Sequence, residues 1–93
     1  MSAVDRPGPS PFATHWTIDP EVTYLNHGSF GACPRPVLAA QTRWRERLER
    51  EPIVFLVHEL EELLTEAKTA LARFVGAPAA DVVFVPTATA GVN

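Results

Sequence analysis

Residues 82–85 of this chain read Val-Val-Phe-Val, an unbroken apolar run that Pro86 ends. A short continuous run of β-branched and aromatic residues favours a strand that is covered on both faces, as in a parallel sheet. Such a strand needs neighbouring strands on its two sides and helices above and below the sheet. The run therefore predicts an α/β fold in which this segment is an interior strand.

Only one other segment has strand character, residues 22–25, which are β-prone and short. The periodic sequence that remains predicts two amphipathic helices, over residues 36–50 and 53–75. Their apolar stripes comprise Val37, Ala40, Trp44 and Leu48 in the first helix, and Leu56, Leu60, Leu63, Leu64, Ala67, Leu71 and Phe74 in the second. Gly76 suits the left-handed position after the second helix, and Pro78 follows as a stop.

A third helix is expected to start after the apolar run, where Thr87, Ala88 and Thr89 precede residues 90–93. So few residues cannot persist as a helix on their own, and one other short strand cannot enclose an interior strand. We therefore expect an N-terminal piece of a larger α/β protein, with a disordered arm over residues 1–13 that is rich in Pro, Ser and Gly. Two alternatives remain open. One is a non-catalytic helical module that binds a partner through the stripe of residues 56–74, and the other is the remnant of a degraded gene.

Charge and composition narrow the possible functions. The net charge of -3 and the pI of about 5.5 leave no basic surplus for binding nucleic acid. No apolar run approaches the ~20 residues of a membrane span, and the proline-rich N-terminus does not resemble a signal peptide. Cys33 is the only cysteine, so an internal disulfide is impossible, which fits a cytoplasmic protein.

Metal and nucleotide motifs are absent from the sequence. The three histidines and Cys33 show no paired ligand spacing, so no metal site is expected. Residues 28–31 (GSFG) lack the first G-x-G of a dinucleotide fingerprint, and no P-loop occurs. Thr87 and Thr89 lie where a strand, a short hydroxyl-rich turn and a helix start follow one another, which is a common way to hold a phosphate. A threonine in that position is also a common helix cap with no ligand.

Two motifs read together give a more specific indication. The stretch TYLNHGSFGACPRPV is followed, after the two predicted helices, by FVPTATAGVN. In this order they resemble the class V aminotransferase superfamily of pyridoxal-phosphate-dependent enzymes, and within it the isopenicillin N epimerase-like proteins. The resemblance covers about residues 12–93. It implies the N-terminal segment of a fold type I transferase, comprising the arm, two helices and the first strand of the large-domain sheet, with residues 14–93 stopping before the catalytic centre.

The resemblance also implies binding residues. In family members an Ala-Thr step at a helix N-terminus holds the cofactor phosphate, and here that step is Ala88 and Thr89. Thr87 stands where this subgroup often has Asn, so the first position of the turn departs from the pattern. Asn26, His27 and Gly28 match a segment that runs along the active-site mouth in relatives, which implies a substrate-side role. The alternative for this segment is a turn that only positions the chain.

No catalytic residue of such an enzyme is expected within these 93 residues. The lysine that binds pyridoxal phosphate covalently and the acid that pairs with its pyridine nitrogen normally lie further along the chain. Lys68, the only lysine, falls within the second predicted helix and does not match the family's lysine. The resemblance implies a homodimeric parent enzyme that acts on an amino-acid-type substrate by epimerisation, amino transfer or carbon–sulfur lysis.

Overall fold

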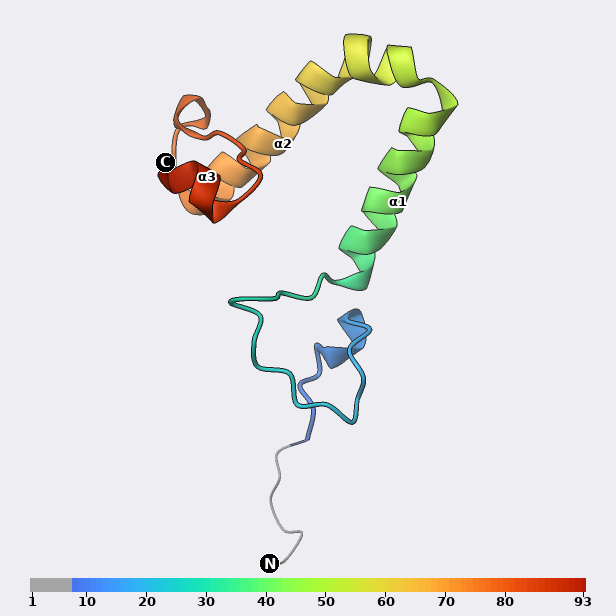
Figure 1. Cartoon of the computed structure of the whole chain (residues 1–93), viewed down its shortest axis with the longest axis vertical. Coiled ribbons are helices and arrows are strands. Elements are labelled where there is room, and N and C mark those ends of the chain that lie inside the picture. The colour runs from blue at the N-terminus through green and yellow to red at the C-terminus, as the bar shows by residue number, and fades with distance from the viewer. Residues whose placement is uncertain (1–7) are drawn as a thin grey trace, which may run out of the picture. The chain divides into compact units, whose positions relative to one another are not determined.

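The structure is a computed structural model that describes residues 8–93. The chain divides into two compact units, Met1–Glu46 and Arg47–Asn93. Helix α1 (Arg35–Arg50) begins in the first unit and ends in the second. Figure 1 labels α1, α2 and α3 in the order in which they follow along the chain.

Within the described residues, the first regular element of the first unit is η1 (Ala13–His15), a single 3-10 turn, and the chain then continues as irregular structure up to α1. Asp19 turns the chain, because its carboxylate oxygen Oδ1 accepts the Glu21 N–H at 2.9 Å and its carbonyl accepts the Val22 N–H at 3.0 Å. Residues 22–25 are not a strand, so that prediction is wrong. The predicted disordered arm, residues 1–13, lies for the most part outside the described residues and stays a prediction.

Helix α1 confirms the first predicted helix to within one residue. It begins directly after Pro34, whose carbonyl accepts the N–H groups of Val37 and Leu38, both at 3.1 Å. Pro36 lies in the first turn, where a residue without an N–H removes no intrahelical hydrogen bond. None of the side chains of α1 is buried, and its apolar stripe is exposed or half-buried.

The second unit is helical from Pro52 to Val75, which confirms the second predicted helix. It starts with the wide π turn η2 (Val54–Glu59) and continues as α2 (Leu60–Val75). At the junction the Leu60 N–H bonds to the carbonyl of Phe55, five residues back. Arg47 and Glu59 form an ion pair with Nη2 2.7 Å from Oε2, and because both side chains are partly exposed it contributes under about 1 kcal/mol.

Helix α2 ends at Gly76 as the sequence predicts. Gly76 has φ 73° and ψ 32°, the left-handed conformation that an L side chain disfavours. Its N–H and that of Ala77 both reach the carbonyl of Ala72, which closes the helix end. The chain then forms η3 (Ala79–Asp81), which packs against α2.

The interior strand predicted for residues 82–85 is not formed, and residues 8–93 contain no strand at all. The segment is extended, with Val82 at φ -109° and ψ 130°. It lacks a partner because a β ladder requires a second extended segment whose N–H and C=O groups face it, and none of the described residues supplies one. Val83 is accordingly 76% exposed. The fold of the described chain is therefore helical and irregular, and the sheet expected of an α/β protein is not confirmed.

Few side chains in residues 8–93 are buried. Phe55 of η2, 9% exposed, and Ala72 of α2, 2% exposed, are the two buried residues of that range. By contrast Phe74, which the periodicity places on the apolar stripe, is 88% exposed. The helices thus carry apolar faces that the described residues do not cover. None of the helices in residues 8–93 combines the length and apolarity needed to cross a membrane.

Candidate functional site

The predicted cofactor turn lies at the start of α3 (Ala88–Val92), in the second unit. Thr87 is extended, with φ -148° and ψ 161°, and its Oγ1 accepts the Ala90 N–H at 3.1 Å. The Thr87 carbonyl accepts the Gly91 N–H, also at 3.1 Å. This arrangement is a helix N-cap, so the prediction that the threonine turn starts a helix is confirmed.

The cap leaves some polar groups of the turn available to a ligand. Among residues 8–93 no hydrogen bond engages the backbone N–H groups of Ala88 and Thr89 or the hydroxyl of Thr89. Both residues are exposed. Three donors on two consecutive residues match the needs of a phosphate group, which accepts hydrogen bonds and carries negative charge. These donors therefore fit the phosphate of pyridoxal phosphate.

Gly91 brings α3 close to the extended segment that precedes it. A Cβ built on Gly91 would lie 3.2 Å from Cγ2 of Val85, which is tighter than an ordinary van der Waals contact. Because Gly91 has no side chain, the backbone of α3 can pack closely against the side chain of Val85. The glycine of the second sequence motif thus has a packing role in shaping this turn.

The predicted substrate-side segment forms a tight loop in the first unit. The carbonyl of Asn26 accepts the N–H groups of Ser29 and Phe30, at 3.2 and 2.9 Å. A Cβ on Gly31 would lie 3.0 Å from the carbonyl oxygen of His27, so a side chain at this position would require the backbone to shift by a few tenths of an ångström. The motif therefore forms a closely packed turn, and the substrate-side role of Asn26, His27 and Gly28 stays a prediction.

Two aromatic side chains brace this loop. The phenol of Tyr24 donates to the carbonyl of Phe30. The rings of Tyr24 and His27 lie edge to face, with centroids 4.8 Å apart and planes at 78°. His27 also accepts the Ala32 N–H at its Nδ1, at 3.3 Å. The ring contact with Tyr24 and the hydrogen bond from Ala32 therefore both hold the imidazole of His27.

Trp16 bonds to the end of the same loop and Arg35 bonds to Trp16, and the sequence analysis did not identify either residue. The indole N–H of Trp16 donates to the carbonyl of Ala32 at 3.3 Å. Nε and Nη2 of Arg35 both donate to the carbonyl of Trp16 at 3.4 Å. The only sequence signal for these contacts is that both residues carry strong donors and flank the motif, which does not specify their partners.

A cavity of about 980 Å³ that is open to solvent lies within the first unit, and Trp16, Tyr24, His27 and Arg35 contribute to its lining. Of the three predicted substrate-side residues, His27 lines this cavity, while Asn26 and Gly28 do not. The lining combines aromatic surface with a guanidinium group, an imidazole and the carboxylate of Asp19. Such a mixture can accept a ligand that has an apolar part and an anionic group.

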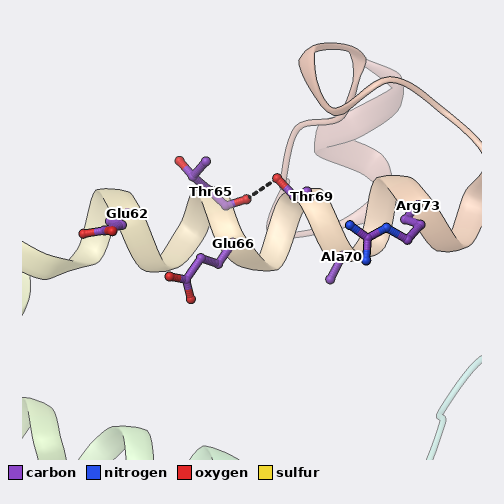
Figure 2. A pocket seen from close by; sticks show the side chains of 6 residues that line it. All are labelled: Glu62, Thr65, Glu66, Thr69, Ala70 and Arg73. Carbon is purple, nitrogen blue, oxygen red and sulfur yellow. Dashed lines mark hydrogen bonds between the residues drawn. The ribbon is translucent and has the colours of Figure 1, made fainter.

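A second hollow lies along one side of α2 in the second unit. Its lining side chains are those of Glu62, Thr65, Glu66, Thr69, Ala70 and Arg73. Figure 2 shows that all six come from a single helix, and that Thr69 turns back to bond the Thr65 carbonyl, at 2.8 Å. The hydroxyl of Thr65 makes the same kind of bond to Glu61. Because no other element faces it, this hollow is an ordinary helix surface and not a binding site.

The two predicted groups of site residues lie in different units of the chain. Thr87, Ala88 and Thr89 lie in the second unit, and Asn26, His27 and Gly28 lie in the first. Within residues 8–93 no cluster of three or more His, Cys, Asp or Glu side chains could hold a metal ion. The thiol of Cys33 is free and half-buried. The site elements are therefore a phosphate-compatible turn and a braced loop, each defined within its own unit.

Comparison with known proteins gives relatives of two kinds. An isopenicillin N epimerase of Streptomyces clavuligerus is 38% identical over 76 residues, which are 82% of this chain and 19% of that protein. An isopenicillin N epimerase of Amycolatopsis lactamdurans is 40% identical over 77 residues, which are 83% of this chain and 19% of that protein. An L-cysteine desulfhydrase of Arabidopsis thaliana is 38% identical over 72 residues, which are 77% of this chain and 15% of that protein.

No family model matches the chain, and no solved structure matches it significantly. The chain spans less than a fifth of the length of the curated relatives that it matches. The resemblance inferred from the two sequence motifs is nevertheless confirmed. The chain is related to a part of the isopenicillin N epimerases and L-cysteine desulfhydrases, which are class V pyridoxal-phosphate-dependent enzymes.

Proposed function

We propose that this chain is the N-terminal part of a pyridoxal-phosphate-dependent enzyme that acts on an amino-acid-type substrate. The observation that carries the proposal is the identity of about 40% with an isopenicillin N epimerase over 83% of the chain. The relatives are named for two activities, that of an isopenicillin N epimerase and that of an L-cysteine desulfhydrase. Epimerisation, amino transfer and carbon–sulfur lysis are therefore the reactions to test.

Ala88 and Thr89 are the proposed phosphate ligands. Their two backbone N–H groups and the Thr89 hydroxyl have no hydrogen-bond partner in residues 8–93 and can all donate to one anion. Thr87 caps α3 by accepting the Ala90 N–H, which leaves the N–H groups of Ala88 and Thr89 available to the phosphate. When bound, pyridoxal phosphate supplies an electron sink for bonds broken at the substrate's α-carbon.

Asn26, His27 and Gly28 are the proposed substrate-side residues. The support for His27 is its place in the lining of the cavity of the first unit. Asn26 shapes the loop that carries His27, because its carbonyl accepts the N–H groups of Ser29 and Phe30. Gly28 is included because it follows His27 directly in the same loop. No catalytic residue is proposed within this chain.

The uncovered apolar surface of the described residues supports assignment to a larger protein. The four residues 82–85 are extended and have no strand partner, and the side chains of Val83 and Phe74 are largely exposed. Burying such side chains is worth about 1.5–3 kcal/mol each. The proposed parent enzyme covers them with its sheet and its remaining helices. We also propose that the parent is a cytoplasmic homodimer that binds neither nucleic acid nor a membrane.

One alternative function has an observation of its own. The exposed apolar stripe of α2 also suits a non-catalytic helical module that docks on a partner protein. The two proposals differ in what the gene encodes after Asn93. A reading frame that continues into a strand-end Asp and a later Lys supports the enzyme, whereas a stop codon directly after Asn93 supports the module or a degraded gene.

The biochemical test uses the product of the entire reading frame. It is purified with pyridoxal phosphate, and the visible absorption of the bound cofactor is measured before and after borohydride reduction. We expect one cofactor per chain, fixed by reduction to a lysine other than Lys68. A product that binds no pyridoxal phosphate would contradict the proposed function.

A further inference from the structure

Both backbone polar groups of Ala32 are held by side chains. Its N–H donates to Nδ1 of His27, and its carbonyl accepts from the indole N–H of Trp16, both at 3.3 Å. The carbonyl of Trp16 in turn accepts from Nε and Nη2 of Arg35. A continuous series of hydrogen bonds therefore runs from Arg35 through Trp16 and Ala32 to the imidazole of His27, entirely within the first unit.

The hydrogen bond at Nδ1 decides which nitrogen of His27 carries the ring proton. A ring nitrogen that accepts a hydrogen bond has no proton, so in the neutral imidazole the proton is on Nε2. Among residues 8–93 no hydrogen bond engages Nε2 of His27. The edge-to-face contact with Tyr24 holds the ring plane. His27 therefore has a fixed ring and one free donor.

Trp16, Arg35 and His27 all line the same cavity of about 980 Å³. Asp19 and Arg35 are the charged side chains of that lining. A ligand that meets both the Nε2–H of His27 and the guanidinium of Arg35 must accept hydrogen bonds, and a carboxylate does so with charge complementarity to Arg35. The cavity thus has the donor set for the carboxylate of an amino-acid-type substrate.

We propose that Trp16 and Arg35 are positioning residues for His27, and that the fixed imidazole presents its Nε2–H to the substrate carboxylate. The carboxylate role rests on the function proposed above, whereas the positioning role rests on the hydrogen bonds of the first unit alone. Trp16 and Arg35 act on His27 through the backbone of Ala32.

The positioning role is tested in the 93-residue chain by amide hydrogen exchange at Ala32. Trp16→Phe keeps a ring but removes the indole donor, so we expect Ala32 exchange to speed up by roughly two- to tenfold. Trp44→Phe removes an indole N–H in α1 and serves as the matched control, with Ala32 exchange unchanged. His27→Asn places a carboxamide oxygen near the position of Nδ1 and should retain the protection, whereas His27→Gln should lose it.

The carboxylate role is tested in the product of the entire reading frame. Trp16→Phe should raise the KM of the amino-acid substrate by roughly two- to tenfold, with kcat and the dissociation constant of pyridoxal phosphate little changed. His27→Asn should raise KM at least as much, although its Ala32 amide stays protected. A role of Trp16 in folding alone would instead lower both activity and cofactor binding.

Each result decides a separate point. Equal Ala32 exchange in the wild-type chain, Trp16→Phe and His27→Gln would overturn the positioning role. An unchanged KM in His27→Asn would overturn the carboxylate contact. Failure to bind pyridoxal phosphate would contradict the proposed function, and the exchange rates of Ala32 would still decide whether Trp16 positions His27.

Discussion

The hydroxyl oxygen of Thr87 accepts a hydrogen bond from the backbone N–H of Ala90 at 3.1 Å, and with it the extended segment ends and α3 begins. Because only Thr87 takes part in this bond, Thr87 and Thr89 have different roles. Thr87 satisfies a donor of the helix itself, whereas the Thr89 hydroxyl makes no hydrogen bond within residues 8–93. A cap and a phosphate ligand can therefore be distinguished by substitution.

The first prediction concerns that cap. Thr87→Ala removes the acceptor and should weaken the start of α3 by about 1 kcal/mol, because N-cap threonine is worth that much on average. Thr87→Ser retains the hydroxyl and should lose little. The measurement is amide exchange at Ala90 in the two variants. Equal exchange rates would mean that the Thr87 hydroxyl does not hold the helix start.

A second prediction concerns the end of α2. Gly76→Ala should destabilise the helix by roughly 1–2 kcal/mol, because the residue has φ 73° and an L side chain resists this conformation. The space around Gly76 is open, so the cost comes from the backbone and not from a clash. Gly8→Ala, also in open space and without a positive φ, is the control. Helical circular dichroism against urea concentration measures the difference, and equal midpoints would contradict the backbone account.

Lys68 gives a third prediction. It lies on α2 in the second unit and does not match the family's lysine, so the 93-residue chain should form no stoichiometric covalent adduct with pyridoxal phosphate. Borohydride reduction followed by peptide mass spectrometry detects such an adduct. A single reduced adduct per chain that maps to Lys68 would refute this prediction.

The fourth prediction concerns residues 82–85. Their backbone N–H groups lack strand partners in the described chain, so the amides of residues 83–85 should exchange rapidly in the isolated 93-residue chain. In the product of the entire reading frame the same amides should be protected, because the proposed sheet pairs them. Rapid exchange in both proteins would contradict the α/β fold proposed for the parent.

Local sequence signals predicted most of the helical structure. The apolar spacing of α1 and α2 and the glycine at the end of α2 depend on residues within a few positions of one another, so one segment at a time is sufficient to predict them. The same holds for the threonine turn, where Thr87 and Ala90 are three residues apart.

Features that depend on distant partners were not predictable in this way. The strand expected over residues 82–85 needs a second strand that the described residues do not supply. The hydrogen bond between Trp16 and Ala32 spans 16 positions of the sequence, and the bond between Arg35 and Trp16 spans 19. The π turn of η2 was also not predicted. The spacing of apolar residues does not distinguish an α-helix, where each N–H bonds to the fourth residue back, from a single π turn, where it bonds to the fifth.

The most direct test measures cofactor affinity in the product of the entire reading frame, with its covalently binding lysine replaced so that only noncovalent contacts remain. Thr89→Val keeps the shape of the side chain and removes the hydroxyl. A hydrogen bond to a charged group is worth about 1.5–3 kcal/mol, so the dissociation constant of pyridoxal phosphate should rise by roughly ten- to a hundredfold. Thr89→Ser, which retains the hydroxyl, should bind pyridoxal phosphate nearly as tightly as the protein with Thr89 does. An unchanged dissociation constant in Thr89→Val would contradict the assignment of Thr89 as a phosphate ligand.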